Sequence, residues 1–263
     1  MTNTWTSESG GDLSAGYARH TGTLRGALRH ALVARALRAH LPAEQQRVLD
    51  VGGGDGHQAV QLARAGHDVT VLDTDPRMLK RAQERLAIER DIVRRRVHLV
   101  EGAGEDADKL VGGDFDLVCC HGVLMYVDDP QPLVRALVNA ARPGGLLSVM
   151  TKNASALAMR PALERRWADA RAVMDADTET GNLGVATRAD TLDGIETMLA
   201  DAGANSIAWY GVRVFTDHLG DEPVSEGFDQ VLEAEWEAGA RDPYRLVARQ
   251  IHVMARRLPL NAS

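Results

Sequence analysis

The sequence predicts an α/β fold with one open, seven-stranded sheet, an N-terminal helical cap over residues 14–41 and an insertion over residues 151–190, after the fifth strand. Three observations predict it. Apolar strand-like runs alternate with helical ones between Val48 and Met150, glycines crowd the turn after the first run, and an acid, Asp73, ends the second. With 263 residues and 44% hydrophobic composition, the chain can bury the core of a single domain over residues 1–263.

The segment before Pro42 is predicted as a helix. Apolar residues recur at helical spacing from Leu24 to Leu32, and Arg25 and Arg29 lie beside that stripe. We expect the helix to end before the proline, which cannot continue it. We expect its apolar stripe to pack on another part of the protein and its arginines to stay free for other contacts.

Strands and helices then alternate along the chain. The predicted strands are 48–51, 68–72, 97–101, 117–120 and 146–150, and the predicted helices are 57–65, 76–89 and 132–141. This alternation indicates right-handed crossovers and a parallel sheet covered on both faces. Ligands bind such a sheet at the carboxyl ends of its strands.

After Met150 the alternation stops. A helix is predicted over 156–174, and the polar stretch 175–190 is predicted as a long loop near the site, since long loops are usually functional or disordered. The remaining predicted elements are a helix at 191–202, a strand at 207–215, a helix at 225–239 and a strand at 250–255.

Four glycines follow the first strand, at Gly52, Gly53, Gly54 and Gly56. Glycine lets the backbone turn tightly and approach a ligand closely. A dinucleotide fingerprint requires a third glycine where this chain has His57, so the spacing does not match it. Asp50, just before the loop, would repel a pyrophosphate but suits a cationic ligand. S-adenosylmethionine, with its sulfonium and ammonium groups, is such a ligand.

Asp73 ends the second strand, where its two oxygens can accept hydrogen bonds from both hydroxyls of a ribose. A ribose of NAD would fit equally well. Asp75, immediately before Pro76, is the better helix cap, which leaves Asp73 for the ligand. Thr74, beside it, is assigned to the same binding site.

Several motifs together resemble those of class I S-adenosylmethionine-dependent methyltransferases, which have a Rossmann-like seven-stranded sheet. They are VLDVGGGDG, VTVLDTDPRML, DFDLVCCHGVLMYVDDP and ARPGGLLSVM, within residues 47–150. Four further stretches are similar to the tRNA carboxymethoxyuridine methyltransferases, which esterify the carboxylate of 5-carboxymethoxyuridine at the wobble position. They are TGTLRGALRHAL, HGVLMYVDDP, GVRVFTDHL and DPYRLVARQIHVMARR.

The resemblance implies a set of residues around S-adenosylmethionine. Arg25 would pair with the methionyl carboxylate, and the segment Gly104–Glu105 would lie against the adenine. The full set that the resemblance implies is Arg25, Gly52, Gly53, Asp73, Gly104, Glu105 and His121.

Two residues are candidates for the chemistry. Val212 and Val214 flank Arg213 in a strand-like alternation, which points Arg213 to the opposite side and toward the cleft, where its fork would hold a carboxylate. The alternative is a surface arginine in an ion pair. His121 follows a buried strand and is predicted to contact the cofactor, to act as a base toward a hydroxyl acceptor, or to be structural.

Other residues have simpler interpretations. Cys119 and Cys120 are expected to be reduced core thiols, with no disulfide or metal site. The run at 94–97 with nearby Arg90 is either an RNA-binding patch or a solvated helix end. The apolar face of helix 225–239 packs on the core or on a second copy, so the protein is a monomer or a homodimer.

Composition limits the partners. A net charge of -7 does not suggest a broad cationic surface for nucleic acid, although a local basic patch stays open. No apolar segment is long enough to span a bilayer, and the polar N-terminus lacks a signal-peptide core, so we expect a cytoplasmic protein.

Three functions stay open. The first is carboxyl O-methylation of tRNA or of a small acid, which needs no general base. The second is O- or N-methylation of a small molecule, favoured by an insertion, MDADTETGNLG, that has three acids and no base. The third is S-adenosylmethionine binding without catalysis.

Overall fold

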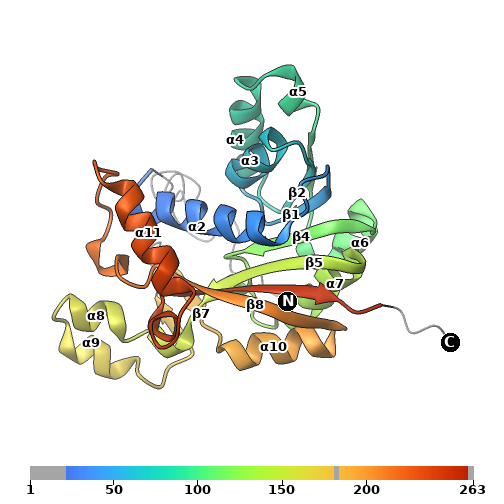
Figure 1. The fold of residues 1–263 in the computed structure, drawn as a ribbon. Coiled ribbons are helices and arrows are strands. Elements are labelled where there is room, and N and C mark those ends of the chain that lie inside the picture. Colours follow the sequence, from blue (N-terminus) through green and yellow to red (C-terminus); the bar gives the residue numbers. More distant parts are fainter. Residues whose placement is uncertain (1–21, 181–183, 260–263) are drawn as a thin grey trace.

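The computed structural model describes residues 22–180 and 184–259. Seven strands form one sheet in the order β3-β2-β1-β4-β5-β9-β8, which confirms the predicted seven-stranded sheet (Figure 1). Its strands are β1 (Arg47–Val51), β2 (Asp68–Asp73), β3 (Val97–Glu101), β4 (Phe115–His121), β5 (Ala141–Lys152), β8 (Ala204–Val212) and β9 (Gln250–Arg257).

The prediction of a parallel sheet is correct for β1 to β5 and wrong for β9. That strand lies antiparallel between β5 and β8, with Gln250 opposite both Lys152 and Val212. The chain therefore leaves β8 and enters β9 at the same edge of the sheet. This reversal brings the residue before β9 to the carboxyl ends of the other strands.

Helices cover both faces of the sheet. Leu32 of α2, Leu62 of α3 and Leu86 of α4 pack on one face, and Leu133 of α7 and Ile195 of α10 pack on the other. The helices are α2 (Leu24–His40), α3 (His57–Arg64), α4 (Pro76–Ala87), α5 (Asp91–Arg94), α6 (Ala107–Val111), α7 (Gln131–Ala140), α8 (Met159–Leu163), α9 (Trp167–Ala172), α10 (Leu192–Asp201) and α11 (Phe228–Gly239).

Adjacent strand residues face opposite cores. Cys119 packs with the α2 and α3 side chains, and Cys120 packs with those of α7. Both thiols are free and fully buried, as predicted for core cysteines.

The N-terminal helix, α2, begins at Leu24, where the side chain of Thr23 accepts a hydrogen bond from the N–H of Gly26 at 3.3 Å. The part of the predicted cap before residue 22 lies outside the described residues. The helix ends at His40, before Pro42, as predicted.

The predictions for the insertion are wrong in detail. Instead of one helix over 156–174 there are two short helices, α8 and α9, because Arg165 between them has a left-handed φ of 61°. Instead of a loop over 175–190, β6 (Thr178–Thr180) pairs with β7 (Ala186–Arg188) in a hairpin. The threonines of the hairpin are β-branched and favour extended backbone. The polar residues around them led to the prediction of a loop instead.

Within the described ranges, no helix is long and apolar enough to cross a bilayer. In the same part of the chain, no three His, Cys, Asp or Glu side chains gather as metal ligands.

Candidate active site

The order of the strands places a crevice at the carboxyl ends of β1 and β4. Successive strands spread outward from this pair, β2 and β3 to one side and β5 to the other. Ligands of open α/β sheets bind at such a point. The glycine loop after β1 and His121 at the end of β4 meet here, so two of the predicted segments share one site.

The glycine loop has a conformation that other residues rarely adopt. Gly52 and Gly54 have left-handed φ angles of 66° and 57°. A Cβ at Gly52 would lie 2.2 Å from a methyl group of Val123. Glycine is therefore required at Gly52 both for conformation and for space.

Asp73 anchors this loop. Its Oδ2 accepts a hydrogen bond from the N–H of Gly54 at 2.8 Å, and its Oδ1 accepts one from the N–H of Asp75 at 2.9 Å. Each oxygen has a second lone pair for a ligand hydroxyl. Asp75 caps α4 by accepting from the N–H of Arg77, which confirms its predicted role.

Asp50 presents a buried oxygen that lacks a partner. The carboxylate is 3% exposed, and its Oδ1 accepts from Gln58 at 3.3 Å. Among the described residues, Oδ2 has no hydrogen-bond donor. It lines a pocket with Arg29, Gly52 and His121, among others. A buried acceptor without a donor is costly, so the pocket fits the ammonium group of S-adenosylmethionine.

This geometry predicts a pH dependence of cofactor binding. Burial, followed by repulsion from Asp73, raises the pKa of Asp50 to about 7, so below that pH the ligand-free carboxyl takes up a proton. An ammonium group needs the carboxylate. Calorimetry should therefore show affinity for S-adenosylmethionine changing only about twofold between pH 8 and 7 and falling roughly tenfold per unit below about pH 6. In Asp50→Asn this step should disappear; a dissociation constant that is constant from pH 5.5 to 8 in the unmodified protein contradicts the assignment.

His121 has no free ring nitrogen. Nδ1 is 2.8 Å from Oε1 of Gln58, and Nε2 is 2.8 Å from Oγ of Ser148. Burial lowers the pKa of the ring well below its usual range. The structure thus argues against the general-base alternative, because neither nitrogen is available to take a proton from an acceptor. The backbone carbonyl of His121 faces the site and accepts from Arg29 at 2.9 Å.

The residues assigned to the nucleoside end lie at the ends of β2 and β3. Thr74 is exposed next to Asp73. Gly104 and Glu105 form a 3₁₀ turn just after β3, which lies beside β2. A Cβ at Gly104 would lie 2.7 Å from side-chain carbons of both Leu133 and Val51, so packing beneath the turn requires this glycine.

Arg25, which the resemblance assigns to the methionyl carboxylate, lies in the first turn of α2. Its guanidinium pairs with Asp221 and does not line the pocket beside Asp50, whereas Arg29, one turn further along α2, does. Sequence reasoning noted Arg29 beside the apolar stripe but did not assign it to the site. The i, i+4 spacing of the two arginines was the available signal.

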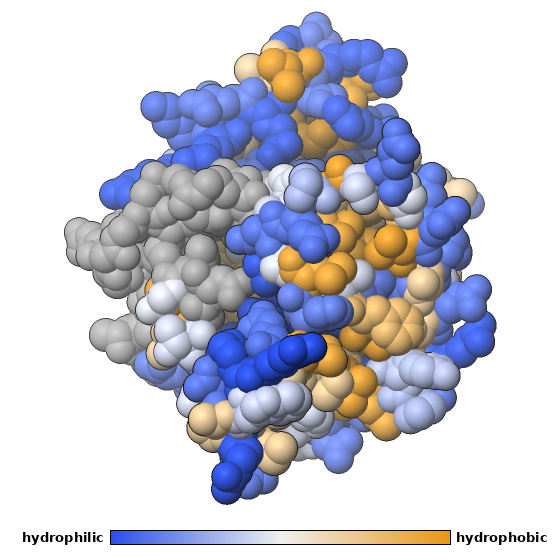
Figure 2. Space-filling model, turned by 90° about the vertical axis from the view of Figure 1, so that its left-hand side faces the viewer, coloured by the Kyte–Doolittle hydropathy of each residue, from blue (hydrophilic) through white to orange (hydrophobic). Residues whose placement is uncertain are grey.

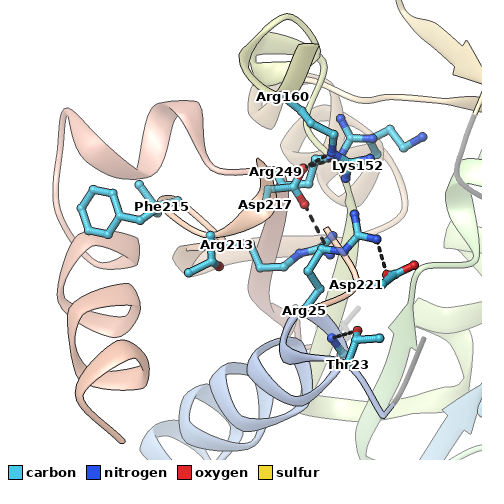
Figure 3. A network of polar contacts seen from close by, with 12 residues as sticks. Thr23, Arg25, Lys152, Arg160, Arg213, Phe215, Asp217, Asp221 and Arg249 are labelled. Carbon is cyan, nitrogen blue, oxygen red and sulfur yellow. Dashed lines mark hydrogen bonds and ion pairs between the residues drawn. The ribbon is translucent and has the colours of Figure 1, made fainter. Parts of the chain in front are cut away.

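A second group of side chains lies close to the first. We call it the cationic cluster: five cations around the carboxylate of Asp217, each with a side chain no more than 12% exposed, namely Arg25, Lys152, Arg160, Arg213 and Arg249 (Figure 3). Lys152 ends β5, Arg249 precedes β9 and Arg213 follows β8. Three strand ends therefore place them at the same edge of the sheet as the glycine loop.

Asp217 takes part in three of the six ion pairs of the cationic cluster. It pairs with Arg160, and its two oxygens lie 3.4 Å from Nη1 of Arg213 and 3.7 Å from Nε of Arg249. Burial lowers the pKa of Arg213 to about 10 and that of Arg249 to about 9. Both guanidinium groups therefore stay protonated near neutral pH but are less stable than they would be in water.

Glu179 of the hairpin reaches the other side of the cluster. Its Oε1 is 2.6 Å from Nζ of Lys152 and pairs also with Arg249. Burial and then repulsion from Arg249 lower the pKa of Lys152 to about 7. One acid of the acidic insertion thus points inward and neutralises part of the cluster.

The prediction that Arg213 lies within a strand is wrong. The strand β8 ends at Val212, and Arg213 has a left-handed φ of 62°. The next three N–H groups, of residues 214 to 216, all donate to the carboxylate of Glu235 on α11, which is fully buried. These three hydrogen bonds compensate for the strain of the left-handed backbone at Arg213. They hold the loop so that the Arg213 side chain points into the cluster.

Sequence reasoning missed most of these residues. Lys152, Arg249 and Glu179 come together only through the pairing of β5 with β9 and the folding of the hairpin. Each looks like an ordinary surface charge in its local sequence. Glu235 is likewise one acid among several on its helix.

Three aromatic side chains of the described part of the chain lie at the surface of the elements around the cluster. Phe215 and Tyr244 lie edge to face at 6.2 Å and are about half exposed, as is Trp167 of α9. Figure 3 shows the Phe215 ring pointing away from the cluster. Figure 2, which faces the side of the molecule that carries α8, α9 and α11, shows apolar patches within a largely hydrophilic surface.

Comparison with known proteins finds relatives that match nearly the whole chain. The tRNA 5-carboxymethoxyuridine methyltransferase of Escherichia coli (strain K12) is 31% identical over 251 residues, which are 94% of this chain and 95% of the relative. The ubiquinone biosynthesis O-methyltransferase of Xanthomonas axonopodis pv. citri (strain 306) is 38% identical over 116 residues, 44% of this chain and 46% of the relative.

Residues 49–149 match the methyltransferase domain family. An S-adenosylmethionine-dependent methyltransferase from Mesorhizobium loti has a similar fold, with a TM-score of 0.58 and 24% identity over 88% of this chain and 100% of that one. A glycopeptide N-methyltransferase solved with S-adenosylmethionine gives a TM-score of 0.58 at 13% identity, over 88% of this chain and 94% of that one.

Proposed function

Because this chain belongs to the S-adenosylmethionine-dependent methyltransferases, in the family of the tRNA 5-carboxymethoxyuridine methyltransferases, we propose that it transfers the methyl group to a carboxylate oxygen of its acceptor. The observation that carries the proposal is the cationic cluster. The cluster lies beside the pocket lined by Asp50, Arg29 and Gly52, which we call the donor pocket. It contains more buried cations than buried carboxylates. A carboxylate is the acceptor that such a place recognises best.

The charge balance supports an anionic acceptor. Five cations in the cluster face the carboxylates of Asp217, Glu179 and Asp221, and Asp221 is 67% exposed. Buried charges are stable only when they are paired. An incoming carboxylate would supply the missing partner, and the planar fork of Arg213 can bind it through two parallel hydrogen bonds.

Helix α2 links the two parts of the site. Arg29 lines the donor pocket and Arg25 belongs to the cluster, and four residues of an α-helix rise about 6 Å. A carboxylate held by the cluster would therefore lie within a few ångströms of the donor. In this reaction positioning does most of the work, because it replaces a bimolecular encounter with an aligned one.

The chemistry needs no general base. A carboxylate is already ionised near neutral pH. One of its oxygens donates a lone pair to the methyl carbon, the carbon–sulfur bond breaks with its electrons on sulfur, and a methyl ester and S-adenosylhomocysteine result without proton transfer. This agrees with a site in which both ring nitrogens of His121 are occupied.

The acceptor we propose is the 5-carboxymethoxyuridine of tRNA, from the activity named for the relative that matches 94% of the chain. The three acids of the insertion would repel the phosphates of tRNA if all of them faced outward. Glu179, one of the three, instead faces inward and pairs with Lys152 and Arg249. Among the described residues, the exposed rings that could stack on bases include Trp167, Phe215 and Tyr244.

The test is transfer of labelled methyl from S-adenosylmethionine to total tRNA from a deletion strain of the source organism. We expect nucleoside mass spectrometry to find label as a methyl ester of carboxymethoxyuridine, released as methanol by mild alkali. Asp73→Ala, which loses the ribose acceptor and the anchor of the glycine loop, serves as the inactive control. Alkali-stable label would indicate an ether or N-methyl product. Unlabelled tRNA in a preparation that binds the cofactor would overturn the tRNA acceptor.

A further inference from the structure

The strongest concentration of positive charge on this acidic chain is the segment between β2 and β3. We call residues 76–96, which include α4 and α5, the basic arm. It holds eight basic and three acidic residues, a net charge of +5, in a chain whose net charge is -7. The rest of the chain therefore carries a net charge of -12.

The charges of the basic arm are also poorly paired. Within the described residues, nine Lys and Arg side chains make neither an ion pair nor a hydrogen bond, and five of the nine belong to the basic arm: Arg77, Lys80, Arg81, Arg90 and Arg95. Four of these five are exposed and Arg81 is half-buried. Most other surface cations of the molecule have a carboxylate nearby, such as Arg142 with Asp116. The arm thus presents free positive charge to a partner.

The position of the arm relates it to the donor site. Helix α4 begins at Pro76, three residues after Asp73, and runs outward to α5 at the end of the molecule that projects in Figure 1. Twelve helical residues span about 18 Å. Arg77 therefore lies near the donor pocket, and Arg90 and Arg95 lie at the far end, well away from it.

We infer that the basic arm binds the sugar–phosphate backbone of an RNA acceptor, away from the nucleotide that is methylated. The inference rests on the proposed function, which makes the acceptor an RNA. An arm of arginines leading from the site suits consecutive phosphates, and such contacts fix the position of a nucleic acid without reading its sequence. It gives an acidic protein a local surface for tRNA.

The test compares two charge-reversal pairs. Arg90→Glu/Arg95→Glu changes the tip of the arm, and Lys109→Glu/Arg135→Glu makes the same change of charge on α6 and α7, on the opposite face of the sheet. At about 100 mM salt the arm pair should weaken binding of total tRNA at least tenfold and lower its salt slope by roughly 1.4 to 1.8. The control pair should change the affinity less than about threefold.

Measuring turnover with tRNA and with the free nucleoside distinguishes a failure of this inference from a failure of the proposed function. The arm pair should raise KM for tRNA, with kcat, cofactor affinity and turnover of free carboxymethoxyuridine unchanged. If the arm pair binds tRNA as the control pair does, the inference is overturned even where the unmodified enzyme methylates the nucleoside. If the unmodified enzyme methylates neither acceptor, the proposed function fails, and the binding measurement still decides the role of the arm. Arg90→Gln/Arg95→Gln, which removes the same two contacts and should lower the salt slope by a similar amount, replaces the pair if charge reversal impairs folding.

Discussion

Replacing Arg213 with methionine is expected to lower kcat/KM for the acceptor by at least about 30-fold. Methionine keeps much of the side-chain volume but removes the fork that we assign to the acceptor carboxylate. Truncating one member of a buried, hydrogen-bonded charge pair costs about 2 to 5 kcal/mol, which is roughly 30- to 5,000-fold. The dissociation constant of S-adenosylmethionine should stay within about twofold, because Arg213 does not line the donor pocket.

Two further variants make this prediction specific. Arg213→Lys keeps the charge but loses the planar fork, so it should recover only part of the activity. Arg241→Met removes an exposed arginine that pairs with Glu237 on the surface and should leave turnover unchanged. Acceptor turnover of Arg213→Met within about threefold of the unmodified enzyme would remove Arg213 from the site.

Replacing Glu235 with alanine should produce the largest loss of stability. The carboxylate is fully buried and accepts from three backbone N–H groups and from the hydroxyl of Thr216 at 2.6 Å. Removing it leaves these donors without a partner, at a cost of about 3 to 5 kcal/mol. For a chain of this size we expect the melting temperature to fall by roughly 6 to 20 °C.

Glu235→Gln and Glu233→Gln provide the graded controls. Glutamine at 235 keeps one acceptor oxygen, so a smaller loss is expected. Glu233, two residues earlier on the same helix, makes a surface pair with Arg35, and its change should cost less than about 1 kcal/mol. Equal melting temperatures for Glu235→Ala and Glu233→Gln would show that the loop after β8 has another anchor.

The placement of the glycine loop, Asp50 and Asp73 at one edge of the sheet was largely predictable because each of these parts is local. The glycine loop, Asp50 and Asp73 each follow or end a strand that the alternation of apolar residues predicts, and parallel strands bring their carboxyl ends together. Arg25, which the resemblance assigned to the cofactor, pairs with Asp221 in the structure, and its role toward the cofactor stays a prediction.

The acceptor half was not predictable in the same way. Arg213 was singled out for a strand alternation that ends one residue before it, and its neighbours in the cluster were not identified. Lys152 and Arg249 are 97 positions apart in the sequence and meet because β9 runs antiparallel to β5. No periodic pattern in the sequence near either residue predicts the antiparallel pairing of β5 with β9.

The sequence by itself determined the seven strands, most of the helices and the cradle for S-adenosylmethionine, because apolar periodicity and glycine conformation are properties of short segments. Tertiary structure alone decided the direction of β9, the hairpin of the insertion and the cationic cluster. These depend on contacts between distant residues, whose charges and hydrogen-bonding groups have to be satisfied together once they are buried.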